Sequence, residues 1–458
     1  MRYPRAMAEL HDVIVVGGGM AGLAAAWDLR NRDVVLLEAG DRVGGRIRSE
    51  ARGDHWINLG AHVFAGAGSA SDRLIRDTGV DVVPVPGRLT SIAMNGAFLN
   101  SGRVETFPFR IPMPARDRLA LLRTGARLRV EVAKLQRLSK PRAGETPRET
   151  ELRVMGYLAD RSFTDWTGEL PPDADAMFRA TITRSTAESE QLTAGQGIHF
   201  FALVWTKGGG LSNNISGGSQ VLLDAVAREL EGRIQLSTPV EEVVQHDDHV
   251  VVRHAGGELH ARQVVMATQA YETVRIVQDL PAETADALGA VPYGPLIVMG
   301  LLTDETQAMP YDDLYALATP KQPFNMLFNM SNILRHPGRP RVPGGSLFIY
   351  RNGDRGAWKY LEMSDDEVER EWVDALTGLF PDLRGHVKET MILRMPRSLP
   401  YPSPGYDRVL RTLSRPLGRI HLAGDYLGGS YTETAIGSGQ AAALAVRTAL
   451  QTASVPVS

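Results

Sequence analysis

The sequence predicts an α/β fold in which one domain is assembled from three separate stretches of chain and a second domain is inserted between them. An apolar run with a glycine-rich turn lies between residues 12 and 48. Short apolar runs typical of buried strands return at residues 208–270, and a strand followed by a small-residue helix closes the chain at 412–458. The intervening stretches have helical or alternating patterns, as expected for a helical and mixed-sheet insertion.

The first stretch combines a buried strand with a turn suited to a phosphate ligand. Residues 13–16 are Val-Ile-Val-Val, a run typical of a strand covered on both faces. Gly17, Gly19 and Gly22 then form G-x-G-x-x-G before a helical pattern at 20–30. The first glycine permits a tight turn, the second a close approach to pyrophosphate, and the third close helix–strand packing. Helix N-terminal amides would face the anion.

A second apolar strand completes a βαβ unit. It covers residues 34–37 and ends at Glu38, about twenty residues after the first glycine, where a carboxylate can accept hydrogen bonds from a ribose. These features predict a Rossmann-type dinucleotide-binding domain. The alternative interpretation is a tight strand-to-helix turn without a ligand.

Composition excludes several other functions. The chain has 458 residues, which is enough for two to three domains, and its net charge of −3 gives no bulk attraction to nucleic acid. No apolar run approaches the ~20 residues of a membrane span, and residues 1–10 lack the apolar core of a signal peptide, so we expect a cytoplasmic protein. Cysteine is absent and the histidines are scattered, so we expect no metal site and no cysteinyl flavin.

The residues after Glu38 indicate which dinucleotide is bound. Glu38-Ala-Gly-Asp-Arg-Val-Gly-Gly-Arg46 closely resembles the extended FAD signature of the flavin amine oxidase superfamily, which includes protoporphyrinogen oxidases and phytoene desaturases. The resemblance implies a GR2-like FAD-binding domain with non-covalent FAD. Together with the glycine fingerprint it predicts these FAD-binding residues: Gly17, Gly19, Met20, Ala21, Gly22, Glu38, Ala39, Arg42, Gly45 and Arg46.

Three later segments resemble the same superfamily. Residues 57–62 match a segment that passes close to the flavin, and the Thr-Pro-Val at 238–240 matches a block whose valine backbone contacts adenine. The Ala-Gly-Asp at 423–425 precedes a small-residue helix, where a carboxylate can bind ribityl hydroxyls and helix amides can face the flavin pyrimidine. The further predicted FAD contacts are Gly60, Ala61, Val240, Gly424, Asp425, Thr432, Thr434 and Ala435.

These assignments divide the chain into five segments. We expect the FAD-binding domain to comprise 1–89, 208–270 and 412–458, a helical substrate or cap domain at 90–207, and a substrate-domain mixed sheet at 271–411. Within the insertions, 140–150 has the composition of a mobile linker, and 365–379 has that of a helix with acidic residues at its start.

Three residues are candidates for the reaction. In amine oxidases of this superfamily a strand resembling Val-Pro-x-Gly-x-x-x-Lys carries a lysine bridged by water to flavin N5, but here Val298 occupies that position. This departure is closer to protoporphyrinogen oxidases and desaturases; the alternative is an amine oxidase that dispenses with lysine. Tyr431 falls where amine oxidases place one wall of an aromatic cage. His62 could donate to flavin or substrate, or be a satisfied loop histidine.

A basic segment at 115–142 admits two interpretations. Arginines and lysines greatly outnumber acids there, and Leu119, Leu122, Ala126 and Val130 could form an apolar stripe at helical spacing. Such a helix can make weak contact with an anionic membrane, although a solvated helix face is the commoner outcome. The sequence gives no indication of oligomeric state.

The motifs at both termini favour an FAD-dependent oxidoreductase. We expect two-electron oxidation of a CH–CH or CH–NH unit of a small molecule, with hydride transfer to flavin N5 and reoxidation by O2 or another acceptor. The protoporphyrinogen oxidase and desaturase branch is favoured over an amine oxidase without the lysine. A non-catalytic FAD-binding protein remains an alternative, and an NAD(P)-only dehydrogenase leaves the terminal motif unexplained.

Overall fold

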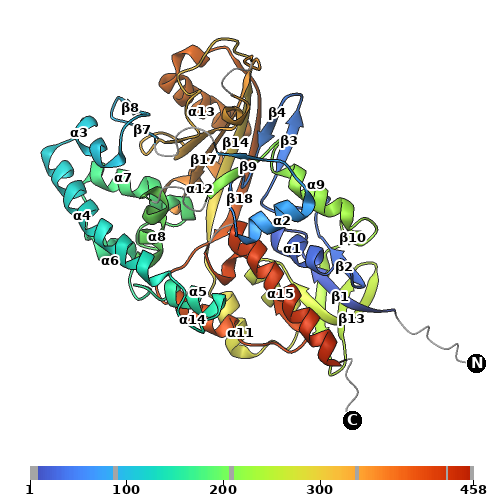
Figure 1. Ribbon diagram of the computed structural model, residues 1–458. Helices are drawn as coiled ribbons and strands as arrows, with labels where there is room; N and C mark the ends of the chain where they lie inside the picture. The colour runs from blue at the N-terminus through green and yellow to red at the C-terminus, as the bar shows by residue number, and fades with distance from the viewer. Residues whose placement is uncertain (1–8, 86–90, 206–210, 336–339, 430–431, 454–458) are drawn as a thin grey trace, which may run out of the picture.

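The computed structural model describes residues 9–85, 91–205, 211–335, 340–429 and 432–453. Within them the chain forms two large sheets, each covered by helices, and the N- and C-terminal segments lie together on the first sheet (Figure 1). This confirms the predicted α/β fold with a mixed-sheet and helical insertion.

The first sheet contains the strands that we expected in the Rossmann-type domain. Its strands, in spatial order, are β10 (Ile234–Gln235), β2 (Val34–Leu37), β1 (Leu10–Val16), β13 (Gly257–Met266), β12 (Val250–His254) and β11 (Val240–Gln245), with β19 (Ile420–Leu422) also paired to β13. The pairs that involve β1, β2, β10 and β19 are parallel, whereas β11, β12 and β13 pair antiparallel.

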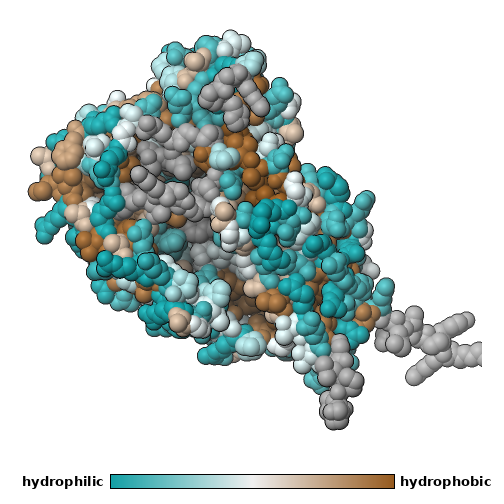
Figure 2. Space-filling view, viewed as in Figure 1, coloured by the Kyte–Doolittle hydropathy of each residue, from teal (hydrophilic) through white to brown (hydrophobic). Residues whose placement is uncertain are grey.

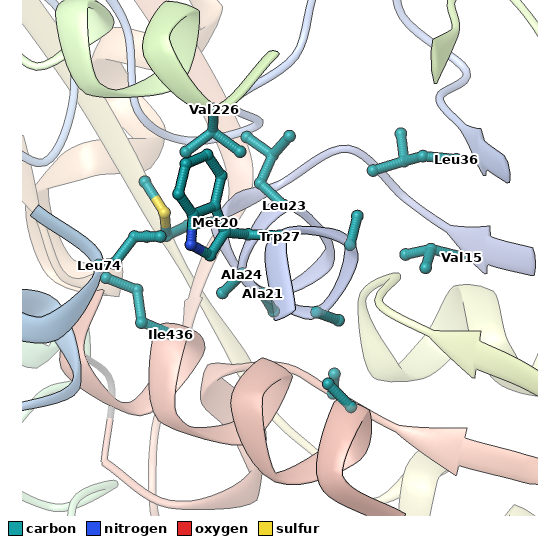
Figure 3. Close-up of a cluster of buried hydrophobic side chains, with 14 of the residues drawn as sticks. Val15, Met20, Ala21, Leu23, Ala24, Trp27, Leu36, Leu74, Val226 and Ile436 are labelled. Carbon is teal, nitrogen blue, oxygen red and sulfur yellow. The ribbon is translucent and has the colours of Figure 1, made fainter. Parts of the chain in front are cut away.

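Both faces of β1 are buried, which explains its continuous apolar run. Val13 and Val15 join one core cluster and Ile14 and Val16 join another on the opposite face. The first cluster is formed with helices α1 (Met20–Asp28), α2 (Ala70–Thr78), α9 (Gln220–Glu229) and α15 (Thr432–Ala453). Figure 3 shows the indole of Trp27 among side chains from several of these helices. Each fully buried valine or leucine stabilises the fold by about 1.5–3 kcal/mol.

The second sheet is mixed and contains strands from two expected segments. Its order is β18 (Val387–Pro400), β14 (Tyr293–Thr303), β17 (Gly345–Asn352), β16 (Met326–Asn329), β15 (Ala316–Ala318), β7 (Ser91–Met94) and β8 (Ala97–Leu99). Strands β7 and β8 come from the segment 90–207 that we expected to be helical, and β7 pairs parallel with β15. The boundary at residue 90 therefore does not separate helical from sheet structure.

Helices cover the second sheet and form a bundle beside it. Helices α12 (Asp354–Glu362) and α13 (Asp365–Leu379) pack on one face, and α13 has the predicted bounds with a Ser364–Glu367 capping box. The bundle contains α4 (Ala115–Leu138), α6 (Phe163–Thr167), α7 (Pro172–Ile182) and α8 (Ala194–Trp205). The remaining helices are α3 (Phe107–Arg110), α5 (Pro147–Met155), α10 (Ala270–Ile276), α11 (Ala282–Gly289) and α14 (Tyr406–Leu413).

Two short sheets connect the large ones. Strands β3 (Ser49–Arg52) and β4 (His55–Asn58) form a hairpin, and β5 (Phe64–Ala65), β9 (Leu211–Ile215) and β6 (Val82–Pro84) form a three-stranded sheet. A hydrogen bond joins the hairpin to the second sheet: the Ser346 hydroxyl of β17 donates to the Trp56 carbonyl of β4.

Two details of the helical insertion differ from the sequence prediction. The expected linker 140–150 contains the start of α5, whose first turn is fixed by a capping box between Thr146 and Glu149. In α4 the buried stripe is formed by Leu121, Leu128, Val132 and Leu135, not by the predicted stripe. Leu119 and Val130 of the predicted stripe are 67% and 55% exposed, and Figure 2 shows hydrophobic residues at this end of the molecule.

Candidate active site

The glycine turn after β1 has the geometry that the fingerprint predicts. Gly17 has φ +106°, and a Cβ at Gly22 would lie 1.9 Å from the Gly17 carbonyl oxygen, so helix and strand touch only because residue 22 has no side chain. A Cβ at Gly19 would meet no described atom within 4 Å. No side chain caps the start of α1 in the described structure, so the amides of Met20 and Ala21 face an open space suited to a pyrophosphate.

The carboxylate of Glu38 joins two glycine turns. It accepts hydrogen bonds from the Gly18 amide at 2.6 Å and from the Gly40 amide at 2.7 Å. Ala39, between Glu38 and Gly40 in the chain, is exposed. The carboxylate therefore lies beside the phosphate-binding turn. Its contact with a ribose stays a prediction.

The second glycine loop packs directly on the first. The Gly44 amide donates to the Gly18 carbonyl at 2.8 Å, and a Cβ at Gly45 would lie 3.4 Å from the Cα of Gly19. Arg42 donates to the carbonyl oxygens of Gly45 (2.8 Å) and Ile47 (3.0 Å). The Arg42 guanidinium therefore stabilises the loop, and its contact with FAD stays a prediction.

Arg46 links the N-terminal and C-terminal motifs. Its guanidinium forms a bidentate ion pair with Asp425, with nitrogen–oxygen distances of 2.8 and 2.9 Å, and also donates to the Ser398 carbonyl. The Asp425 side chain is 7% exposed. The two motifs that the sequence assigned to one cofactor are thus in direct contact.

The start of α15 is fixed beside the start of α1. A Cβ at Gly439 would lie 2.1 Å from the Ala21 carbonyl oxygen, so the two helices are in backbone contact. The Glu433 carboxylate accepts from the amides of Ala70 (2.6 Å) and Ser71 (2.9 Å) at the start of α2.

The remaining predicted FAD-binding residues lie in the Ala-Gly-Asp motif, in β11 and at the start of α15. Gly424 donates its amide to Ser438 Oγ, Val240 begins β11, and the first turn of α15 contains Thr432, Thr434 and Ala435. Tyr431 lies outside the described residues.

The segment at Gly60 is held against the second glycine loop. A Cβ at Gly60 would lie 2.2 Å from the Arg46 carbonyl oxygen, so this glycine permits backbone packing. Its own carbonyl accepts from Asn58 Nδ2 at 2.8 Å and contacts His62 Nδ1 at 3.0 Å. Ala61, between them, is exposed.

His62 is buried in an aromatic enclosure. Its ring lies 4.7 Å from that of Phe328, 5.2 Å from Phe348 and 6.1 Å from Tyr315. Burial lowers the pKa of His62 to about 4, the Gly60 carbonyl partly opposes this, and Arg184 lowers it further. The ring is therefore neutral at pH 7.

The free nitrogen of His62 is an acceptor. His62 Nδ1 lies 3.0 Å from the Gly60 carbonyl oxygen, which can only accept, and 3.3 Å from Asn58 Nδ2, which can only donate. The shorter contact favours the tautomer with the proton on Nδ1 and with Nε2 unprotonated. Nε2 is buried and has no hydrogen-bond partner among the described atoms. The sequence suggested a donor or a satisfied loop histidine. In this tautomer the side chain is neither, because a buried acceptor is left for a ligand.

Val298 belongs to the same apolar cluster. It is 0% exposed on β14, opposite Tyr350 of β17 and Leu393 of β18. Its cluster includes Trp56 and Leu59 and the aromatic residues that surround His62. Two of the three candidate catalytic residues, Val298 and His62, therefore border the same group of aromatic side chains.

The aromatic residues around His62 were missed from sequence. Tyr315, Phe328 and Phe348 come from the second sheet and its connections, where they read as ordinary core residues. Only the pairing of distant strands brings them to His62.

A cavity of about 350 Å³ lies between α4, α7, α8 and the second sheet. Its walls are mainly apolar and include Phe201 of α8 and Met326 of β16, a member of the cluster around Val298. The cavity therefore lies between the helical bundle and the apolar cluster that contains Val298, although neither Val298 nor His62 is among its lining residues.

Comparison with known proteins agrees with this geometry. The family model described as "Flavin containing amine oxidoreductase" matches residues 20–447. The chain belongs to this family. It is an FAD-dependent oxidoreductase, and the two glycine loops, the α1 N-terminus and Asp425 are suited to that cofactor.

Relatives come from two enzyme classes. Amine oxidase [flavin-containing] A of Canis lupus familiaris is 24% identical over 96% of this chain and 86% of its own length. Coproporphyrinogen III oxidase of Mycobacterium tuberculosis is 26% identical over 95% of this chain and 97% of its own length. The structure of cyclohexylamine oxidase from Brevibacterium oxydans superimposes with a TM-score of 0.77 at 18% identity over 97% of this chain and 100% of that chain.

In the described residues, no helix is long and apolar enough to cross a membrane.

Proposed function

We propose that this enzyme oxidises a CH–CH unit of an apolar substrate by two electrons, as in the porphyrinogen oxidase and desaturase branch. The observation that carries the proposal is Val298, which fills the expected lysine position. It is fully buried against Trp56 and the aromatic rings around His62, so this wall is dry and uncharged. An ammonium group there would be buried without a counter-ion, at a cost of several kcal/mol.

The residues of the chain divide the work of binding and proton transfer. Bound FAD would supply the hydride acceptor. We propose that it is held non-covalently, with Glu38 at the ribose and with Arg46, Asp425 and the starts of α1 and α15 at the phosphate and flavin portions. The apolar cluster at Val298 excludes water from the reacting carbon. His62 Nε2, the buried unprotonated nitrogen, accepts the proton that leaves when a C=C bond forms. Reoxidation requires O2 or another acceptor.

Amine oxidation without the lysine is a second candidate. The aromatic rings around His62 favour it, because aromatic faces attract an amine or its cation. Amines would then bind with their nitrogen near His62. This candidate and the first make opposite predictions for residue 298.

Val298→Lys tests the choice. We expect purified Val298→Lys to retain FAD but to lose anaerobic flavin reduction by coproporphyrinogen III, the substrate named for one relative. Val298→Met, of similar length without charge, is the matched control and should keep most of that activity. A Val298→Lys enzyme whose flavin is reduced rapidly by benzylamine would move the assignment to the amine oxidases.

A further inference from the structure

Three charged side chains, Glu105, Arg129 and Arg184, line the mainly apolar cavity. The cavity surface includes Phe107, Leu121, Met177, Phe178, Phe201 and Met326. At its outer side Arg129 pairs with Glu105, and these side chains are 43% and 36% exposed. Arg184 also lines the cavity, and its guanidinium interacts with the Tyr350 hydroxyl and acts electrostatically on His62.

The backbone that carries Arg184 is held in place from two sides. Arg184 lies in the short 3-10 helix Thr183–Ser185, which ends at Thr186 with φ +67°, an uncommon conformation for a β-branched residue. Thr186 Oγ1 donates to the Leu399 carbonyl of β18, and a Cβ at Gly294 would lie 2.2 Å from the Thr186 carbonyl oxygen. The strands that carry Val298 and Leu399 therefore fix the position of Arg184.

The charge of Arg184 is not neutralised by the acids that lie nearest to it in the chain. Glu188 pairs with Arg179 at 2.7 Å, and Asp175 also faces Arg179. Among the residues that the structure describes, no ion pair involves Arg184. Its effects are instead seen on neutral neighbours: burial raises the pKa of Tyr350 and the guanidinium opposes that rise, and Arg184 adds to the lowering of the His62 pKa. A partly buried guanidinium without a carboxylate favours an anionic ligand.

We propose that Arg184 binds a carboxylate of the substrate, with the Tyr350 hydroxyl as a second donor. The substrate is then an apolar molecule bearing a carboxylate, whose body fills the cavity and whose reacting carbon faces His62 and Val298. A simple amine or diamine is disfavoured, because its ammonium group would approach an unpaired guanidinium. This inference rests on the proposed function, which supplies the reaction but not the substrate class.

Binding of a carboxylate that cannot be oxidised separates this inference from the reaction. We would measure the Kd of the FAD-bound protein for 3-phenylpropionate and for the uncharged 3-phenylpropanamide by perturbation of the flavin spectrum. Wild type should bind the carboxylate at least tenfold more tightly. Arg184→Met should remove this preference, Arg184→Lys should retain part of it, and FAD content should stay unchanged in both.

A charge control and two substrate pairs complete the experiment. Arg123→Met removes an exposed arginine of α4 outside the cavity and should leave both Kd values within twofold of wild type. Anaerobic flavin reduction by phenylalanine against phenethylamine, and by coproporphyrinogen III against etioporphyrinogen, shows whether the carboxylate belongs to an amino acid or to a porphyrinogen.

Two outcomes would overturn the inference. In the first, wild type binds 3-phenylpropionate and 3-phenylpropanamide with equal Kd values or binds neither of them. In the second, Arg184→Met keeps the wild-type preference for the carboxylate. If carboxylates bind through Arg184 but none of the substrates reduces the flavin, the proposed reaction fails and the carboxylate site stands. If phenethylamine reduces the flavin as fast as phenylalanine does, the enzyme oxidises amines without selecting a carboxylate, and the carboxylate site fails.

Discussion

Protonation of His62 should destabilise the fold in a defined pH window. Burial lowers its pKa from 6.5 to about 4, so the unfolded chain binds a proton more tightly than the folded protein. The contribution of neutral His62 to stability is therefore fully present above pH 6.5 and is lost as the pH falls toward 4. For these two pKa values the linkage relation gives a loss of about 2 kcal/mol at pH 5 relative to pH 7.5.

His62→Gln isolates this contribution. Glutamine keeps a hydrogen-bonding side chain but does not titrate, so the difference between wild type and variant should narrow by about 2 kcal/mol between pH 7.5 and 5. Urea unfolding of both proteins at each pH measures it. His421, whose pKa burial also lowers to about 4, is present in both proteins and cancels. A difference that is constant across this pH range would show that His62 is not buried as a neutral ring.

The cofactor turns give two further predictions. Gly19→Ala should fold but bind FAD weakly, because the added methyl group occupies the open space before α1, whereas Gly22→Ala should unfold at a lower temperature because its methyl group would overlap the Gly17 carbonyl. Thermal unfolding of both apoproteins and titration with FAD separate these two effects. Equal melting temperatures of the two variants would contradict the roles assigned to the two glycines. Glu38→Ala should purify largely as apoprotein, because the loss of hydrogen bonds to a charged group costs on the order of 2–3 kcal/mol. Full flavin occupancy of this variant at low added FAD would argue against a contact between Glu38 and the ribose.

Local sequence signals predicted the parts of the structure that depend on neighbouring residues. The apolar run of β1 reads as a strand because both its faces are buried, and α13 begins where Ser364 can cap it. The sequence also predicted that the motifs containing Arg46 and Asp425 serve one cofactor, but it did not predict the ion pair that joins these two residues.

Features that depend on tertiary contacts could not be predicted from local sequence signals. Helical periodicity predicted the stripe from Leu119 to Val130, but the buried stripe of α4 is the one that contains Leu128, because that face packs in the helical bundle. Residues 91–99 are too short a signal to reveal that they pair with the second sheet. Arg184 lies in no recognisable local motif, and its position follows from the packing of η2 (Thr183–Ser185) against β14 and β18.

The measurement that tests the account most directly is anaerobic reduction of the enzyme-bound flavin, followed by its absorbance near ~450 nm. Apolar amines, porphyrinogens and polyenes would be compared at equal concentration. We predict rapid bleaching by a carboxylate-bearing porphyrinogen and slow or no bleaching by amines without a carboxylate. Bleaching by simple amines alone would contradict the assignment to CH–CH oxidation, and a purified protein that does not take up FAD would contradict the account as a whole.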